Sequence, residues 1–114
     1  MRLPRLAGKG VAKLVVFTGR RFSAAEASQL GFVEVVCADD KLDEQTDSIV
    51  KDIVASSPLG IRAAKQLINE CTEMHIKAAM ALSTALRNPL DHTTDYKEGI
   101  SAWLEKRPAH FASE

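Results

Sequence analysis

Aromatic side chains are scarce in this sequence, at 5% of its 114 residues. Alanine and leucine are plentiful instead, which favours helices over a β-sandwich. No apolar run approaches the roughly 20 residues that a membrane-spanning helix needs. A chain of this length forms at most one domain. The composition therefore predicts a mainly α-helical domain without a membrane partner.

Cysteine is also rare, and neither sign of charge is in excess. Cys37 and Cys71 could form one disulfide but not a disulfide framework, and we interpret both as reduced and buried. Reduced cysteines are typical of the cytoplasm and of the mitochondrial matrix, which are the predicted locations. The 15 basic and 15 acidic residues leave a net charge of zero. This balance gives no general attraction to nucleic acid or to anionic membranes.

Two helices and one strand are predicted in the first third of the chain. Apolar residues at helical spacing predict a helix over about residues 7–17. Ser23 and Glu26 have the spacing of a capping box, in which each side chain binds the other's backbone N–H. Gly31 suits the left-handed residue that ends such a helix. The next segment, Phe32–Val36, is rich in β-branched residues and predicts a short strand.

The predicted strand Phe32–Val36 has no second strand of similar strength in the sequence. Unpaired backbone N–H and C=O groups are costly when buried, so we expect this strand to pair with strands outside the sequence. The helical pattern also begins close to Met1. Both features suggest a portion of a larger fold.

The remainder of the chain predicts four helices. Apolar residues recur at helical spacing over about residues 42–54, 57–71, 74–86 and 95–107. Ser57 is the expected N-cap of the second of these helices, and Pro58 follows at the first helical position, where no backbone N–H is needed. Asp95 and Glu98 have the spacing of another capping box. The predicted fold class is therefore mainly α with one short β-strand.

The motifs alone offer little evidence of catalysis. His75, His92 and His110 are scattered, so no metal site is predicted. The two glycines of "GKG" lack a preceding strand and the full phosphate-loop pattern. Arg20 and Arg21 precede a predicted helix N-terminus, where they bind an anion or form a solvated loop. No pair of carboxylates is spaced for acid–base chemistry, and no cofactor is implied.

Three stretches of the sequence, taken in order, are similar to one known family. They are "RLPRLAGKGVAKLVVFTGRRFSAAEASQLGFVEVV", "SSPLGIRAAKQLIN" and "TTDYKEGISAWLEKRPAHF". Their order and spacing resemble the C-terminal part of the enoyl-CoA hydratases and isomerases, the crotonase superfamily. The resemblance covers nearly the whole chain, whereas the chain corresponds to less than half of a family member.

The resemblance implies a fold that this chain shares only in part. Family members have a spiral of repeated ββα units, followed by a helical region that builds a trimer. Residues 1–36 resemble the end of the spiral core, and residues 37–114 resemble the helical trimerisation region. The expected partners are further copies of the chain, as a trimer or a dimer of trimers. Strand Phe32–Val36 would then pair with upstream strands of the spiral.

The family's chemistry is hydration or double-bond isomerisation of an enoyl-CoA, in fatty-acid or branched-chain acyl-CoA metabolism. Two backbone N–H groups form an oxyanion hole, and usually two glutamates handle the water and the protons. By resemblance, all of these groups lie upstream of the residue that matches Met1. Family members usually have a glutamine before "RLPR", where this sequence has Met1. The resemblance therefore implies no catalytic residue in this chain, which is expected to be inactive alone. Acyl-CoA is the implied substrate.

Two residues of the last predicted helix match family positions that approach the CoA or acyl chain of a neighbouring subunit. They are Trp103 and Lys106 of "AWLEKR". The resemblance implies that Lys106 pairs with a CoA phosphate and that Trp103 flanks the acyl chain or the adenine. The alternatives are a positive charge that suits a helix end and an aromatic residue packed in an interface. Arg87–Pro89 departs from the aromatics and the acid that members often have.

A second hypothesis is a non-catalytic helical oligomerisation module, or a truncated isoform, because the apolar faces of four helices must be buried somewhere. RNA binding, which is known for one relative in the family, is disfavoured here. The charge balance is neutral and the sequence has no basic stripe.

Overall fold

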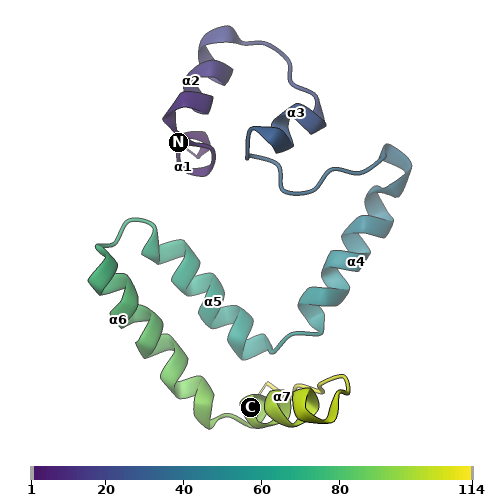
Figure 1. The fold of residues 1–114 in the computed structure, drawn as a ribbon, viewed down its shortest axis with the longest axis vertical. Coiled ribbons are helices and arrows are strands. Elements are labelled where there is room, and N and C mark those ends of the chain that lie inside the picture. Colours follow the sequence, from purple (N-terminus) through teal and green to yellow (C-terminus); the bar gives the residue numbers. More distant parts are fainter. Residues whose placement is uncertain (1, 114) are drawn as a thin grey trace. The chain divides into compact units, whose positions relative to one another are not determined.

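A computed structural model describes residues 2–113 of the chain, and α-helices dominate it (Figure 1). The prediction of a mainly helical fold is confirmed. In chain order, the elements are α1 (Leu3–Leu6), α2 (Gly8–Thr18), α3 (Ala24–Gln29), the 3-10 helix η1 (Asp39–Lys41), α4 (Leu42–Val54), α5 (Pro58–Cys71), α6 (Ile76–Arg87), the 3-10 helix η2 (Asn88–His92) and α7 (Thr94–Glu105).

The packing of the chain divides it into two compact units, Met1–Gln45 and Thr46–Glu114. The first unit holds α1, α2 and α3, and the second holds α5, α6 and α7. This division concerns packing alone. The assignment of residues 1–36 to a spiral core and of residues 37–114 to a trimerisation region stays a prediction.

In the first unit, α2 occupies nearly the predicted residues. It ends at Gly19, whose backbone is left-handed at a φ of 57° and whose N–H donates to the carbonyl of Val15 at 3.2 Å. Left-handed backbone favours glycine, because a side chain there is strained. The helix α1 packs against α2, and Ala12 is the buried side chain of α2.

The predicted capping box of α3 is confirmed. The Ser23 N–H donates to Glu26 Oε2 at 2.9 Å, and the Glu26 N–H donates to Ser23 Oγ at 3.2 Å. The Ser23 backbone N–H, followed by the Ser23 hydroxyl, which donates to Glu26 Oε2 at 3.0 Å, holds the pKa of the Glu26 carboxyl below its usual value of 4.5. The reciprocal bonds satisfy two backbone donors that an open helix end leaves unpaired.

Helix α3 ends in the left-handed residue predicted at Gly31. Its φ is +79°, its N–H donates to the Ser28 carbonyl at 3.0 Å, and the Phe32 N–H donates to the Ala27 carbonyl at 3.2 Å. This pair of bonds is the Schellman motif. We expect Gly31→Ala to destabilise the first unit by about 1 kcal/mol, because alanine is strained at positive φ.

Urea unfolding of the two proteins measures this effect, and Gly10→Ala is the matched control. Gly10 lies within α2, outside the left-handed region, and a Cβ there meets nothing within 4 Å. Alanine is a better helix former than glycine, so Gly10→Ala is expected to stabilise by about 0.5–1 kcal/mol. Equal effects of the two substitutions would contradict the interpretation.

The prediction of a strand over Phe32–Val36 is wrong for this chain. No residue from 2 to 113 is in a β-strand. Strand hydrogen bonds need a second extended segment, and the predicted strand had no partner in the sequence. Phe32 instead packs edge-to-face on Phe22, with ring centroids 6.4 Å apart, while Val35 and Val36 stay exposed.

In the second unit, α5 and α6 pack side by side, and η2 connects α6 to α7 (Figure 1). Ser57 is the N-cap of α5, as predicted, and accepts the Gly60 N–H at 3.3 Å. The predicted capping box of Asp95 and Glu98 is wrong. Thr93 is the N-cap of α7 and accepts the Tyr96 N–H at 3.1 Å, so both acids lie within the helix.

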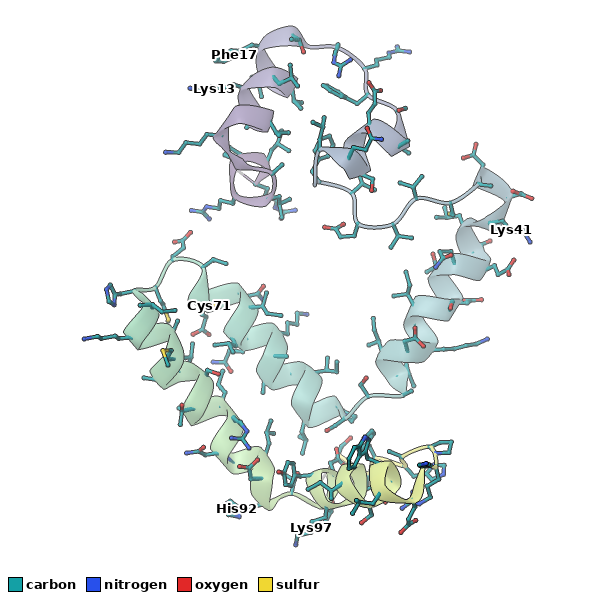
Figure 2. All side chains as sticks on the ribbon, viewed as in Figure 1. Lys13, Phe17, Lys41, Cys71, His92 and Lys97 are labelled. Carbon is teal, nitrogen blue, oxygen red and sulfur yellow. The ribbon has the colours of Figure 1, made fainter. Side chains whose placement is uncertain are left out.

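The buried core of the chain is small, and many large apolar side chains are exposed. Only three hydrophobic side chains among the described residues are buried: Ala12, Ala27 and Ala102. Cys37 and Cys71 are free thiols, and both are half-buried rather than buried; Figure 2 shows Cys71 at the end of α5. None of the helices in residues 2–113 is long and apolar enough to cross a membrane.

Candidate functional site

A groove of about 410 Å³ lies within the second unit. It is formed by the start of α5, the region of η2, one face of α7 and the segment that follows α7. Its lining is mostly apolar and aromatic: Ser57, Gly60, Leu90, Thr93, Asp95, Tyr96, Gly99, Ile100, Trp103 and Phe111. A concave, mostly apolar surface with few polar groups is the usual form of a small-molecule site.

The structure brings the two predicted ligand residues to the same end of α7. Trp103 lines the groove, although 79% of its surface is exposed. Lys106 caps the C-terminus of α7 and is exposed, but it does not line the groove. The two residues are three positions apart in sequence, but Lys106 lies just past the end of α7, where its left-handed backbone departs from helical geometry. The end of α7 thus carries an aromatic side chain of the groove and, three residues later, a positive charge.

Lys106 has an unusual backbone. Its φ is 54° and its ψ is 39°, in the left-handed region. Its N–H donates to the Trp103 carbonyl at 3.3 Å, and the Arg107 N–H donates to the Ala102 carbonyl at 3.0 Å, as in the motif that ends α3. Glycine usually takes this position, and a lysine there costs roughly 1 kcal/mol. Strain of this kind clusters at functional sites.

The segment after α7 folds back onto the helix and is held by Asp95. This carboxylate is only 2% exposed. Its Oδ1 accepts the N–H groups of Ala112 at 2.8 Å and of Ser113 at 3.1 Å, and its Oδ2 accepts the Ser57 hydroxyl at 3.0 Å. A buried carboxylate needs such partners, because an unpaired one is strongly destabilising. Asp95 therefore joins α7, the start of α5 and residues 112–113.

One turn further along α7, Glu98 holds the same segment. Arg107 donates to Glu98 through Nη1 at 2.6 Å and Nη2 at 2.9 Å, and the His110 N–H donates to Glu98 Oε1 at 2.8 Å. The Arg107 guanidinium, followed by the His110 N–H, lowers the pKa of the Glu98 carboxyl to about 2. The paired carboxylates in turn raise the pKa of Arg107 above its usual value. Arg107 is thus occupied in a fixed ion pair.

The Glu98 interaction predicts a pH-dependent attachment of residues 107–110. The pKa of Glu98 is lowered from 4.5 to about 2 in the folded chain. A lowered pKa means that the ion pair stabilises the fold fully above about pH 4.5, and that this stabilisation is lost as the pH falls toward 2. We expect hydrogen-exchange protection of the His110 amide to fall over this interval.

The Glu98→Gln variant is the control for this titration, because its side chain has no carboxyl to protonate. Its His110 amide is expected to show a protection that does not change between pH 6 and pH 2. Constant protection of the His110 amide in the wild-type chain over that range would show that Glu98 does not hold the segment.

A second groove, of about 350 Å³, lies in the first unit between α1 and α2. It combines cations with an apolar floor: Arg2, Leu3, Pro4, Lys9, Ala12, Lys13, Val16 and Phe17. Figure 2 shows Lys13 and Phe17 on α2, where they are one turn apart. The sequence analysis did not predict this groove, although the absence of acidic residues before Glu26 is a visible signal for its positive charge.

The remaining candidate residues have structural partners or form no cluster. The Arg20 guanidinium lies 4.2 Å from the Phe22 ring centroid, and it pairs with Glu26 at 3.3 Å. Because the Arg20 side chain already has these two partners, it is less available to bind an anion. His75 caps α6, where its Nδ1 accepts the Lys77 N–H at 3.4 Å. Across residues 2–113, no group of three or more metal-ligating side chains gathers.

Comparison with known proteins shows the family. The family model for enoyl-CoA hydratase/isomerase matches residues 1–114, the whole chain. The chain belongs to the enoyl-CoA hydratase/isomerase family. The resemblance noted from the three sequence stretches is therefore confirmed.

Two relatives in this family are much longer than the chain. It is 35% identical to the crotonyl-CoA hydratase of Syntrophomonas wolfei, over 99% of this chain and 44% of that protein. It is 34% identical to the mitochondrial enoyl-CoA hydratase of Pongo abelii, over 99% of this chain and 39% of that protein. The chain thus spans less than half the length of these relatives.

A solved structure shows the same local fold. The enoyl-CoA hydratase from Bacillus anthracis matches all of this chain and 44% of its own chain, with a TM-score of 0.96 and 35% sequence identity. The chain therefore matches part of an enoyl-CoA hydratase fold. The family and two candidate ligand residues at the end of α7 were predictable from the sequence, whereas Phe111 and the role of Asp95 were not.

Proposed function

We propose that the chain is the C-terminal, helical portion of an enoyl-CoA hydratase or isomerase, in fatty-acid or branched-chain acyl-CoA metabolism. The observation that carries this proposal is the family match over the whole chain, combined with its coverage of less than half of each relative above. A hydratase adds water across the double bond of an enoyl-CoA, and an isomerase shifts that bond. Both reactions use the same activated thioester.

In this proposal, the C-terminal end of α7 contacts the ligand. Lys106 pairs with a phosphate of CoA, and Trp103 flanks the acyl chain or the adenine. Three observations support it: Trp103 lines a largely apolar groove, Lys106 is exposed three residues later in the sequence, and Lys106 has the strained left-handed backbone. A lysine that only stabilises the helix dipole does not need a left-handed backbone.

The chain alone is proposed to lack hydratase activity. By resemblance, the oxyanion hole and the two glutamates lie in the part of the relatives that precedes the matched residues. Asp95 and Glu98 do not replace them, because each is already bound to backbone N–H groups and to a side-chain donor.

A direct assay tests this proposal. The purified 114-residue chain is expected to give no turnover of crotonyl-CoA above the uncatalysed rate, followed by the loss of enoyl-thioester absorbance. A full-length crotonyl-CoA hydratase is the positive control. Turnover by the chain that scales with its concentration would overturn this part of the proposal.

We further propose that residues 1–36 form the end of a spiral core and residues 37–114 a trimerisation region, in a trimer or a dimer of trimers. Large apolar side chains that are exposed on α4 and α7, outside the groove, support an interface between copies: Leu42, Ile49, Val50, Ile53, Val54 and Leu104. Burying such surfaces stabilises association. Sedimentation is expected to show an oligomer, and a stable monomer would contradict the trimerisation region.

A non-catalytic oligomerisation module is the second candidate, and the same exposed side chains favour it. The two candidates differ in ligand binding, because only the first requires CoA to bind at the end of α7. The proposed location is the cytoplasm or the mitochondrial matrix. One relative, from Pongo abelii, is described as mitochondrial.

A further inference from the structure

The segment after α7 forms part of the groove wall. Phe111 is the lining residue that this segment contributes. Asp95 fixes the segment on one side of Phe111, through the Ala112 and Ser113 N–H groups, and Glu98 fixes it on the other, through His110. The Phe111 backbone therefore has anchors on both sides.

The Phe111 ring lies beside Gly99 of α7. A Cβ added at Gly99 would lie 3.7 Å from Phe111 Cε1, which is ordinary van der Waals contact. The ring therefore lies close to this part of α7, and it forms one wall of the groove.

The chemistry of the groove favours an apolar chain as its occupant. Leu90, Ile100 and Trp103 supply apolar surface. Three polar side chains of the lining are already engaged: Ser57 donates to Asp95, and the Thr93 hydroxyl donates to the Leu90 carbonyl at 2.7 Å. The exposed Lys106 adds a positive charge at the C-terminal end of α7, three residues after Trp103. An amphiphile with an apolar chain and an anionic group matches both features.

We propose that Phe111 is a specificity-determining residue, whose ring limits the length of the acyl chain that the groove accepts. This inference rests on the proposed function, in which the end of α7 contacts an acyl-CoA. Asp95 and Glu98 are positioning residues, because their hydrogen bonds hold the segment that carries the Phe111 ring. Shortening the side chain extends the groove, and enlarging it shortens the groove.

Trp103 provides the readout, because it is the one tryptophan in the sequence and it lines the groove. Its fluorescence is followed during titrations with butyryl-CoA and with decanoyl-CoA. Phe111→Ala is expected to raise the ratio of decanoyl-CoA to butyryl-CoA affinity about tenfold, as expected for roughly two more buried methylene groups. Phe111→Trp adds a second tryptophan, so its affinities for the two thioesters are measured by calorimetry, and it is expected to lower the same ratio.

Ile76→Ala is the control, since it removes an exposed apolar side chain from α6 in the same unit, outside the lining of the groove. It is expected to leave the ratio unchanged. If both thioesters bind but the ratio is the same in all four proteins, the role of Phe111 is wrong and the proposed function stands. If neither thioester nor CoA binds to the wild-type chain, the proposed ligand edge fails, and the inference fails with it.

Discussion

Asp95→Ala is expected to lower the free energy of unfolding of the Thr46–Glu114 unit by about 2–4 kcal/mol. The carboxylate is buried and accepts three hydrogen bonds, from Ser57, Ala112 and Ser113. Alanine leaves three donors without a partner and opens a small void beside α7. Thermal unfolding followed by circular dichroism measures the loss.

Two further variants make this test specific to the hydrogen bonds of Asp95. Asp95→Asn keeps an oxygen that accepts the Ala112 and Ser113 N–H groups, so its loss is expected to be about 1 kcal/mol. Asp52→Ala removes an exposed carboxylate from α4 and is expected to change stability by less than about 0.5 kcal/mol. Equal losses for Asp95→Ala and Asp52→Ala would show that residue 95 does not hold the segment after α7.

Lys106→Gly is expected to change stability and ligand binding in opposite directions. Glycine adopts left-handed backbone without strain, so the variant should gain about 1 kcal/mol of stability. It also loses the ammonium group that is proposed to pair with a CoA phosphate. A charge-assisted hydrogen bond is commonly worth enough to change affinity about tenfold, so CoA affinity is expected to fall by that factor. Thermal unfolding and calorimetric titration measure the two effects.

Three other lysine variants separate charge from backbone. Lys106→Asn tolerates the left-handed conformation and should bind CoA as weakly as Lys106→Gly. Lys106→Arg keeps the charge and should retain most of the affinity. Lys97→Asn removes a charge near the opposite end of α7, where Figure 2 labels it, and should leave the affinity unchanged. If CoA affinity were unchanged in Lys106→Gly, Lys106 would not bind CoA, and its positive charge would only stabilise the C-terminal end of α7.

The helix ends could be predicted from the sequence wherever their signals were local. The Ser23 and Glu26 capping box, the left-handed Gly31 and the Ser57 N-cap all depend on residues within a few positions of one another. Such short-range patterns act through nearby backbone donors and acceptors, so they do not depend on distant packing.

The strand and the last capping box failed for the opposite reason. A strand over Phe32–Val36 needs a neighbouring strand, and no described segment supplies one. Asp95 and Glu98 have capping-box spacing, but their carboxylates bind partners 9 to 18 residues further along the chain. Thr93, two residues earlier, takes the N-cap instead.

The candidate site was only partly visible in the sequence. Trp103 and Lys106 were found through resemblance to the family, and the groove lies beside them. Phe111 could not be placed there from spacing alone, because it reaches Gly99 only when residues 107–113 fold back onto α7. The contacts that hold this segment come from tertiary structure, and no periodic pattern encodes them.

The central claim is that the C-terminal end of α7 is the ligand edge of an enoyl-CoA hydratase/isomerase. Titration of the isotope-labelled chain with CoA, followed by amide chemical shifts, tests it most directly. Because one edge of a site supplies only part of the binding energy, the titration extends into the millimolar range. We expect saturable shifts concentrated at residues 103–107 and at Phe111. Saturable shifts confined to residues outside α7 and the segment after it, or no shifts at all, would contradict the claim.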